Sequence, residues 1–294
     1  MKTRLTKIDI KDLTREALAR WFEDHGMRSF RATQVFKWLY LQQVDDFDQM
    51  TDLGKKTREL LSQNFLSKRL SLNQVATSKD GSEKYLFELG DGNLIESVLI
   101  PEKDHYTLCI SSQVGCSQNC RFCLTAQIGL IRNLTPGEII SQVRDIGHLT
   151  AGSRNLTNIV FMGMGEPLAN YRNVIHALKI ITDSDVGLKI SSRRITLSTA
   201  GLVSRLADLG KDTRINLAVS LNATDNETRS RLMPINRKYP IEKLMQACIN
   251  YPLKNRKKIT FEYILMKGIN DTPEDARRLA RLLRPIKAKI NLIP

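Results

Sequence analysis

The sequence has no long hydrophobic run and no region of biased composition. Its apolar stretches, such as residues 215–221, are far shorter than the ~20 residues that a helix needs to cross a bilayer. The first ten residues contain no apolar segment typical of a secretory signal. With 41% hydrophobic and 26% charged residues among 294, the composition is that of an ordinary globular protein. These features argue against fibrous and membrane proteins and predict a cytoplasmic protein without a membrane partner.

Acidic residues are too few to balance the basic ones. The chain has 45 Lys and Arg against 31 Asp and Glu, a formal net charge of +14. Residues 1–95 hold 16 basic and 14 acidic side chains, whereas residues 96–294 hold 29 and 17. An excess of this size favours a polyanionic partner, most often nucleic acid. The alternative is basic charge on a solvated face that binds no partner.

The hydrophobic pattern divides the chain into three parts. Residues 1–80 predict a small helical domain, with apolar residues at helical spacing over 14–22, 31–40 and 55–66. Residues 81–101 predict a β-hairpin, because two alternating runs flank a Gly-Asp-Gly turn. Residues 102–294 alternate strands with helices and predict a parallel α/β domain. The expected strands cover 106–111, 158–164, 194–199, 215–221, 258–265 and 289–293, and the expected helices cover 136–149, 171–182, 201–209, 240–250 and 273–284.

About six strand–helix units are too few to close an eight-stranded barrel, so the pattern predicts a partial barrel or an open sheet. Ligands bind at the carboxyl ends of the strands in such folds. Four unusual segments follow the first four expected strands: a cysteine cluster, residues 163–167, residues 198–201 and residues 220–222. We therefore expect these segments to meet at one edge of the sheet.

Four of the five cysteines fall within fifteen residues. In a cytosolic chain such a cluster indicates metal or redox chemistry rather than a disulfide framework. Cys116, Cys120 and Cys123 have the spacing C-x3-C-x2-C, which favours a [4Fe–4S] cluster with one open iron. Structural zinc, with Cys109 as a poorly placed fourth ligand, and a redox role remain alternatives. Cys248 stands alone at helical spacing among apolar residues and is interpreted as an inert core thiol.

These segments resemble the radical SAM superfamily and, within it, the RlmN/Cfr family of RNA methyltransferases. The resemblance implies a partial (β/α)6 radical SAM barrel, preceded by a helical accessory RNA-binding domain and the hairpin. It implies one [4Fe–4S] cluster and two molecules of S-adenosylmethionine (SAM) per turnover. It is carried by residues 111–127, 132–135, 161–167, 195–201, 233–236 and 289–294.

The implied reaction methylates C2 of one adenosine in 23S rRNA and of adenosine 37 in tRNA. One SAM methylates a protein cysteine, a second supplies a radical that activates this methyl group, and the carbon adds to C2. The partners implied are 23S rRNA, tRNA and an electron donor such as flavodoxin or ferredoxin. Thr125 to Gln127 favour this activity over the Cfr-type C8 methylation of the same rRNA adenosine. The alternative from another class is a non-catalytic, zinc-bound RNA-binding protein.

The resemblance also assigns roles to individual residues. Glu96 would accept a proton, although a solvent-facing strand residue is the alternative, and Cys109 would help remove the C2 proton and form a disulfide that releases the product. At Asn222 the family usually has histidine, which can ionise near neutral pH as an amide cannot. Cys116, Cys120 and Cys123 would hold the cluster, Gly165 and Glu166 the methionine amine of SAM, and Ser198, Ser220, Leu221 and Asn222 the rest of the cofactor.

The methyl-carrying cysteine of the family lies downstream of the segment that matches residues 289–294. The resemblance therefore predicts that the sequence is incomplete at its C-terminus and that residues 1–294 alone transfer no methyl group to RNA. Cys248 does not match the missing cysteine, because it falls on an expected helix between the fourth and fifth strands.

Overall fold

The computed structural model describes residues 7–150, 155–254 and 257–294. The first six residues, which belong to the segment predicted to contain no secretory signal, lie outside the described residues. The chain divides into two compact units. The first unit takes residues up to 106 with 134–157 and 172–191, and the second takes 107–133, 158–171 and 192–294. The three-part division at residues 80 and 101 stays a prediction. No helix in the described ranges is long and apolar enough to cross a membrane.

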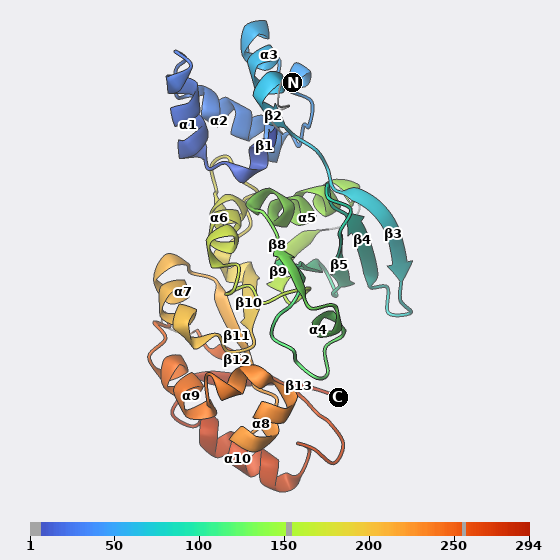
Figure 1. Ribbon diagram of the computed structural model, residues 1–294, viewed down its shortest axis with the longest axis vertical. Helices are drawn as coiled ribbons and strands as arrows, with labels where there is room; N and C mark the ends of the chain where they lie inside the picture. Colours follow the sequence, from blue (N-terminus) through green and yellow to red (C-terminus); the bar gives the residue numbers. More distant parts are fainter. Residues whose placement is uncertain (1–6, 151–154, 255–256) are drawn as a thin grey trace, which may run out of the picture. The chain divides into compact units, whose positions relative to one another are not determined.

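The first unit begins with the three predicted helices, drawn in blue in Figure 1. Thr14 caps the first of them, because its side chain accepts a hydrogen bond from the Ala17 amide at 3.0 Å. The apolar faces meet in a core that contains Phe22 and Phe36, both buried. The helices are α1 (Arg15–Asp24), α2 (Arg31–Phe36, continued by a π-helical turn over Lys37–Leu41) and α3 (Lys55–Asn64), and short strands β1 (Ile8–Asp9) and β2 (Phe65–Leu66) pair beside them.

The predicted hairpin is confirmed and has a third strand, which the sequence did not predict. β3 (Ser71–Thr77), β4 (Glu83–Glu88) and β5 (Leu94–Pro101) form an antiparallel ribbon, seen side by side in Figure 1. The same unit contains α5 (Pro136–Leu149), which begins with a capping box at Thr135, and most of α6 (Tyr171–Thr182). A buried hydrogen bond of 2.9 Å from Ser97 to Gln142 joins β5 to α5.

The second unit is built on the six predicted strands. Their order is β13-β12-β11-β10-β9-β6, and β9 to β13 pair in parallel, as the alternation of strands and helices predicted. Figure 1 shows α7 and α9 alongside these strands. The strands are β6 (Tyr106–Cys109), β9 (Leu156–Phe161), β10 (Ile195–Thr199), β11 (Asn216–Ser220), β12 (Ile259–Ile264) and β13 (Ala288–Ile293), and the helices are α7 (Leu206–Asp212), α8 (Asn226–Leu232), α9 (Ile241–Ile249) and α10 (Pro273–Leu283).

The strand register sets the polar face of this sheet. Ser198 pairs with Ala218, and Ser220 pairs with Glu262. Because alternate residues of a strand point to the same side, Ser198, Ser220 and Glu262 share one face. These three polar side chains lie near the carboxyl ends of β10, β11 and β12, which is where the sequence predicted the ligand site.

Candidate cofactor site

A short hairpin flanks residues 116–123, which contain the three clustered cysteines and are called the cysteine loop below. β7 (Gln113–Gly115) pairs antiparallel with β8 (Leu130–Asn133), and α4 (Leu124–Ile128) precedes β8. Gly115 has φ +74°, and a Cβ there would lie 1.7 Å from the carbonyl oxygen of Gly129. Only glycine fits this close approach of two backbones. The Cys116 amide then donates to the same carbonyl at 2.9 Å, which closes the base of the loop.

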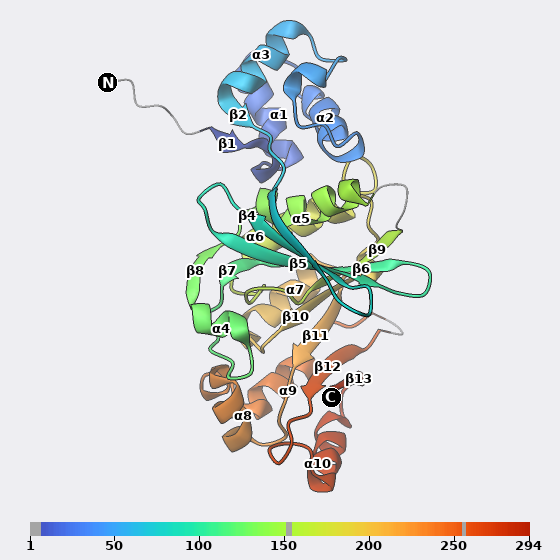
Figure 2. The ribbon, with the colours of Figure 1, turned by 90° about the vertical axis from the view of Figure 1, so that its right-hand side faces the viewer.

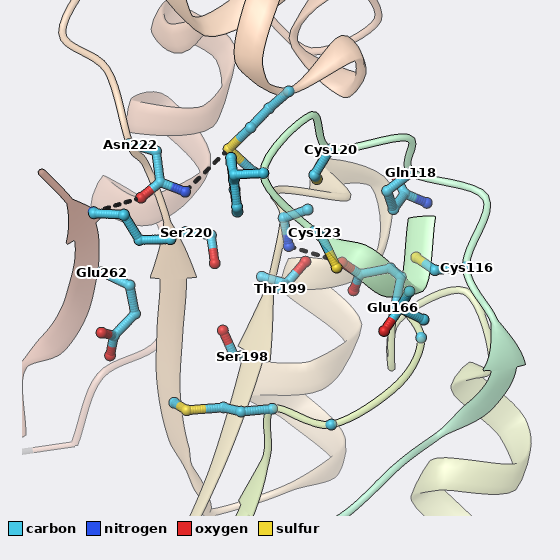
Figure 3. Close-up of a pocket in the computed structure, with 18 of the residues that line it drawn as sticks. Cys116, Gln118, Cys120, Cys123, Glu166, Ser198, Thr199, Ser220, Asn222 and Glu262 are labelled. Atoms are coloured by element: carbon cyan, nitrogen blue, oxygen red, sulfur yellow. Dashed lines mark hydrogen bonds between the residues drawn. The ribbon is translucent and has the colours of Figure 1, made fainter. Parts of the chain in front are cut away.

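The loop directs three thiols into one pocket. Figure 3 shows Cys116, Cys120 and Cys123 in the part of the pocket that also contains Glu166. The Cys123 amide donates to the Cys120 carbonyl at 3.1 Å, and the Arg121 amide donates to the Leu232 carbonyl at 2.9 Å. The loop is thus tied both to itself and to the end of α8.

The burial and mutual proximity of the thiols determine whether they are protonated. The pKa of Cys120 is raised to about 12, mainly by burial and in part by the neighbouring Cys116 and Cys123, because adjacent thiolates repel one another. Burial also raises the pKa of Cys116. A metal centre reverses this preference, because coordination deprotonates a thiol. Within the described ranges no group of three or more His, Cys, Asp or Glu side chains could hold a single metal ion as placed; three cysteine ligands of a [4Fe–4S] cluster bind three different irons.

Glycines bring the end of β9 against β7. A Cβ on Gly163 would lie 2.8 Å from the Ile110 carbonyl group, and one on Gly165, at φ +98°, would lie 2.5 Å from Cβ of Gln113. Gln113 in turn accepts a hydrogen bond of 2.8 Å from the Glu166 amide. The two glycines therefore place residues 163–166 along the wall of the pocket.

Glu166 is an internal acceptor as well as a pocket residue. It is buried, and its two carboxylate oxygens accept hydrogen bonds from the amides of Leu168, at 3.0 Å, and Ala200, at 2.7 Å. Burial raises the pKa of this carboxyl, and the amide donors oppose the shift. The carboxylate therefore joins the ends of β9 and β10, and its remaining lone pairs can accept from a ligand ammonium group.

Not all of the residues predicted to bind the cofactor near the ends of β10 and β11 line the pocket. Ser198, Ser220 and Asn222 line the pocket, whereas Leu221 is fully buried and is not among the lining residues. Asn222 adopts φ +57°, and its Oδ1 accepts from the Ile264 amide at 2.9 Å. Its Nδ2 lies 3.4 Å from the Met233 sulfur. The amide side chain thus connects β11 to β12 (Figure 3).

A buried arginine that the sequence did not predict as a site residue lies behind the pocket. Arg229 on α8 is fully buried and donates to the carbonyls of Ala200, Ser220 and Leu221 at 2.8 to 3.2 Å. A fourth bond, of 3.0 Å, goes to Oδ1 of Asn236. Burial lowers the pKa of Arg229 to about 10, and its charge acts on Cys120. One sequence gives no sign of this role, because arginine in a short polar helix is typical of a solvent-facing position.

The two predicted catalytic residues lie outside the pocket lining. Cys109, at the end of β6, is 9% exposed, and burial raises the pKa of its thiol to about 11. Glu96, on β5 in the first unit, is about two-fifths exposed and forms an ion pair of 2.9 Å with Lys84. Cys248 is buried on α9, as expected for a core thiol.

Comparison with known proteins identifies the family. Residues 8–66 match the N-terminal domain of the ribosomal RNA large subunit methyltransferase, and residues 110–283 match the radical SAM superfamily. A dual-specificity RNA methyltransferase RlmN from Desulfosudis oleivorans is 59% identical, over 97% of this chain and 77% of its own length. The chain belongs to the RlmN family of radical SAM methyltransferases.

Other members agree with this assignment. The RlmN protein of Geotalea uraniireducens is 50% identical over 99% of this chain and 83% of its own length. The crystal structure of a radical SAM methyltransferase from Sphaerobacter thermophilus superimposes with a TM-score of 0.91, at 41% identity, and covers 98% of this chain and 85% of that one. The predicted fold class, a radical SAM α/β domain after a helical N-terminal region, is confirmed.

Proposed function

We propose that the protein methylates C2 of an adenosine in 23S rRNA and of adenosine 37 in tRNA. The observation that carries the proposal is the pocket at the carboxyl ends of the strands, where three cysteines, residues 163–166 and two serines meet in a member of the RlmN family. In this proposal Cys116, Cys120 and Cys123 hold one [4Fe–4S] cluster. When bound and reduced, the cluster supplies one-electron cleavage of SAM.

The other pocket residues position the cofactor. Gly165 and Glu166 hold the methionine amine of SAM, because the carboxylate retains acceptor capacity beside a backbone that only glycine can form. Ser198, Ser220 and Asn222 bind polar groups of the rest of the cofactor. Leu221 contributes through its buried backbone, since its carbonyl accepts from Arg229.

In this proposal, residues outside the pocket lining remove the C2 proton and bind the RNA. Cys109 and Glu96 take part in removing the C2 proton, and Cys109 resolves the covalent protein–RNA intermediate. Two SAM molecules are used per turnover, and a flavodoxin or ferredoxin provides the electron. Basic side chains within residues 96–294, among them Arg193, Arg194 and Arg277, bind the RNA phosphates.

Deletion of the gene that encodes this chain tests the proposal. Nucleoside mass spectrometry should show loss of 2-methyladenosine from both 23S rRNA and tRNA. A gene carrying Cys120→Ala should fail to restore it, whereas the matched control Cys248→Ala, which removes a thiol outside the pocket lining, should restore it. Loss of 8-methyladenosine instead would assign the C8 reaction, and unchanged RNA would refute methyl transfer.

A further inference from the structure

The cysteine loop borders a second depression that is separate from the cofactor pocket. Its volume is about 530 Å³, and none of its lining residues lines the cofactor pocket. It is formed by the cysteine loop, α8 and the 3₁₀ turn Pro234–Arg237 that follows α8. The lining residues are Arg121, Glu227, Ser230, Arg231, Pro234 and Arg237, and we refer to the depression as the arginine depression.

The arginine depression carries excess positive charge. Arg121, Arg231 and Arg237 are exposed, and Glu227 is the one acidic residue among those that line it. Within the described part of the chain, these three guanidinium groups form no ion pair with an acidic side chain. By contrast, Arg277 and Arg281 on α10 both pair with Glu274. Unpaired cations that face one depression are the arrangement that favours an anionic partner.

The depression is fixed to the cysteine loop. Arg121 directly follows Cys120. Its backbone amide donates a hydrogen bond of 2.9 Å to the Leu232 carbonyl, which holds this part of the loop on the end of α8. Both ribbon views show the loop before α4 next to α8 (Figures 1 and 2). Phe122 and Leu124, on the two sides of Cys123, are 37% and 78% exposed. An arginine-rich surface with apolar neighbours thus lies immediately outside the proposed cluster ligands.

We propose that the arginine depression is the docking surface for an acidic one-electron carrier protein of the flavodoxin or ferredoxin type. The inference rests on the proposed function and names the surface used by its electron donor. On docking, the reduced carrier loses one electron and the cluster gains it, and no proton or chemical group is transferred. A carrier needs only to reach the outside of the cysteine loop, which the depression borders. The RNA base must instead enter the cofactor pocket, with which the depression shares no lining residue.

Binding measurements on the anaerobically reconstituted chain test this assignment. The probe is oxidised flavodoxin, and its affinity is measured by calorimetry at low and moderate salt. The variant Arg121→Gln/Arg231→Gln/Arg237→Gln should bind it about tenfold more weakly or worse, and this difference should shrink as salt screens the charges. The matched control, Lys243→Gln/Lys267→Gln/Lys287→Gln, removes three exposed positive charges elsewhere in the second unit and should retain its affinity.

Two further measurements separate this inference from the proposed function. The double variant Arg231→Gln/Arg237→Gln leaves the cysteine loop intact. It should also bind flavodoxin more weakly than the wild type, while its iron content stays the same. SAM cleavage driven by dithionite, which needs no docking, reports on the proposed function alone. Unchanged flavodoxin affinity in both variants overturns the assignment. So does a loss of tRNA affinity that equals or exceeds the loss of flavodoxin affinity, because the depression would then belong to the RNA surface.

Discussion

Individual residues of the pocket act through buried hydrogen bonds that the sequence did not reveal. The three cysteines could be predicted from their spacing, and Gly165 and Glu166 from the resemblance to the radical SAM family. Arg229 could not be predicted, since its role depends on the carbonyls of Ala200, Ser220 and Leu221, which lie at or just after the ends of β10 and β11. Leu221 was expected beside the cofactor, yet strand alternation buries it while its neighbours Ser220 and Asn222 line the pocket.

Glu166→Gln should destabilise the fold as well as the cofactor site. The carboxylate accepts from two backbone amides, and a glutamine presents one oxygen, so its NH₂ group must face an amide donor. An unsatisfied buried group of this kind lowers the free energy of unfolding by about 1–3 kcal/mol, measurable by urea titration. Glu262→Gln is the matched control with a smaller loss, because its one acceptor bond, from Asn291, can be kept. Equal stability of the wild type and Glu166→Gln would disprove the acceptor role.

Cys109 should react slowly with alkylating agents at neutral pH. Burial favours the neutral thiol and raises its pKa to about 11, so at pH 8 roughly one thiol in a thousand is ionised. The rate of reaction with iodoacetamide, followed by peptide mass spectrometry, should rise about tenfold per pH unit between about pH 7 and 9. Cys248, whose pKa is raised to about 12, should react more slowly still. A fast rate at Cys109 that does not change with pH would contradict its burial.

At the scale of elements, the spacing of apolar residues along the sequence was sufficient to predict most of the helices and strands. The expected helix over 136–149 coincides with α5, because Thr135, Pro136 and Glu138 form a capping box that fixes its start. All six strands predicted for the second unit are present, and β9 to β13 pair in parallel as expected. The β7–β8 hairpin and β3 were missed for a physical reason: β3 is exposed along its whole length and has no apolar alternation, and β7 is only three residues long.

The β7–β8 hairpin supports the cysteine loop, so Gly115→Ala tests this element. The added Cβ would overlap the Gly129 carbonyl oxygen, and φ +74° is unfavourable for alanine. The free energy of unfolding should fall by at least about 2 kcal/mol, and the protein should bind less iron on reconstitution. Gly147→Ala in α5, where no heavy atom lies within 4 Å of the new Cβ, is the matched control and should be neutral or slightly stabilising. Normal stability of both variants would contradict the close approach.

At the scale of the whole molecule, charge predicts how the protein binds RNA. Affinity for tRNA should fall at least about a hundredfold between about 50 and about 200 mM salt, because phosphate contacts release counterions. Most of the excess charge lies in residues 96–294, so Lys258→Gln/Lys289→Gln should weaken binding more than the matched pair Lys55→Gln/Lys56→Gln. Arg256, part of the same basic segment as Lys258, lies outside the described residues. Salt-independent affinity, or equal effects of the two pairs, would contradict this distribution.

The proposed function depends on a [4Fe–4S] cluster held by Cys116, Cys120 and Cys123, as we propose. Anaerobic reconstitution with iron and sulfide, followed by metal analysis, is its most direct test. We predict about four irons and four sulfides per chain, with loss of this content in Cys116→Ser, Cys120→Ser and Cys123→Ser and full retention in Cys248→Ser. One zinc per chain with no iron after the same treatment would contradict the account.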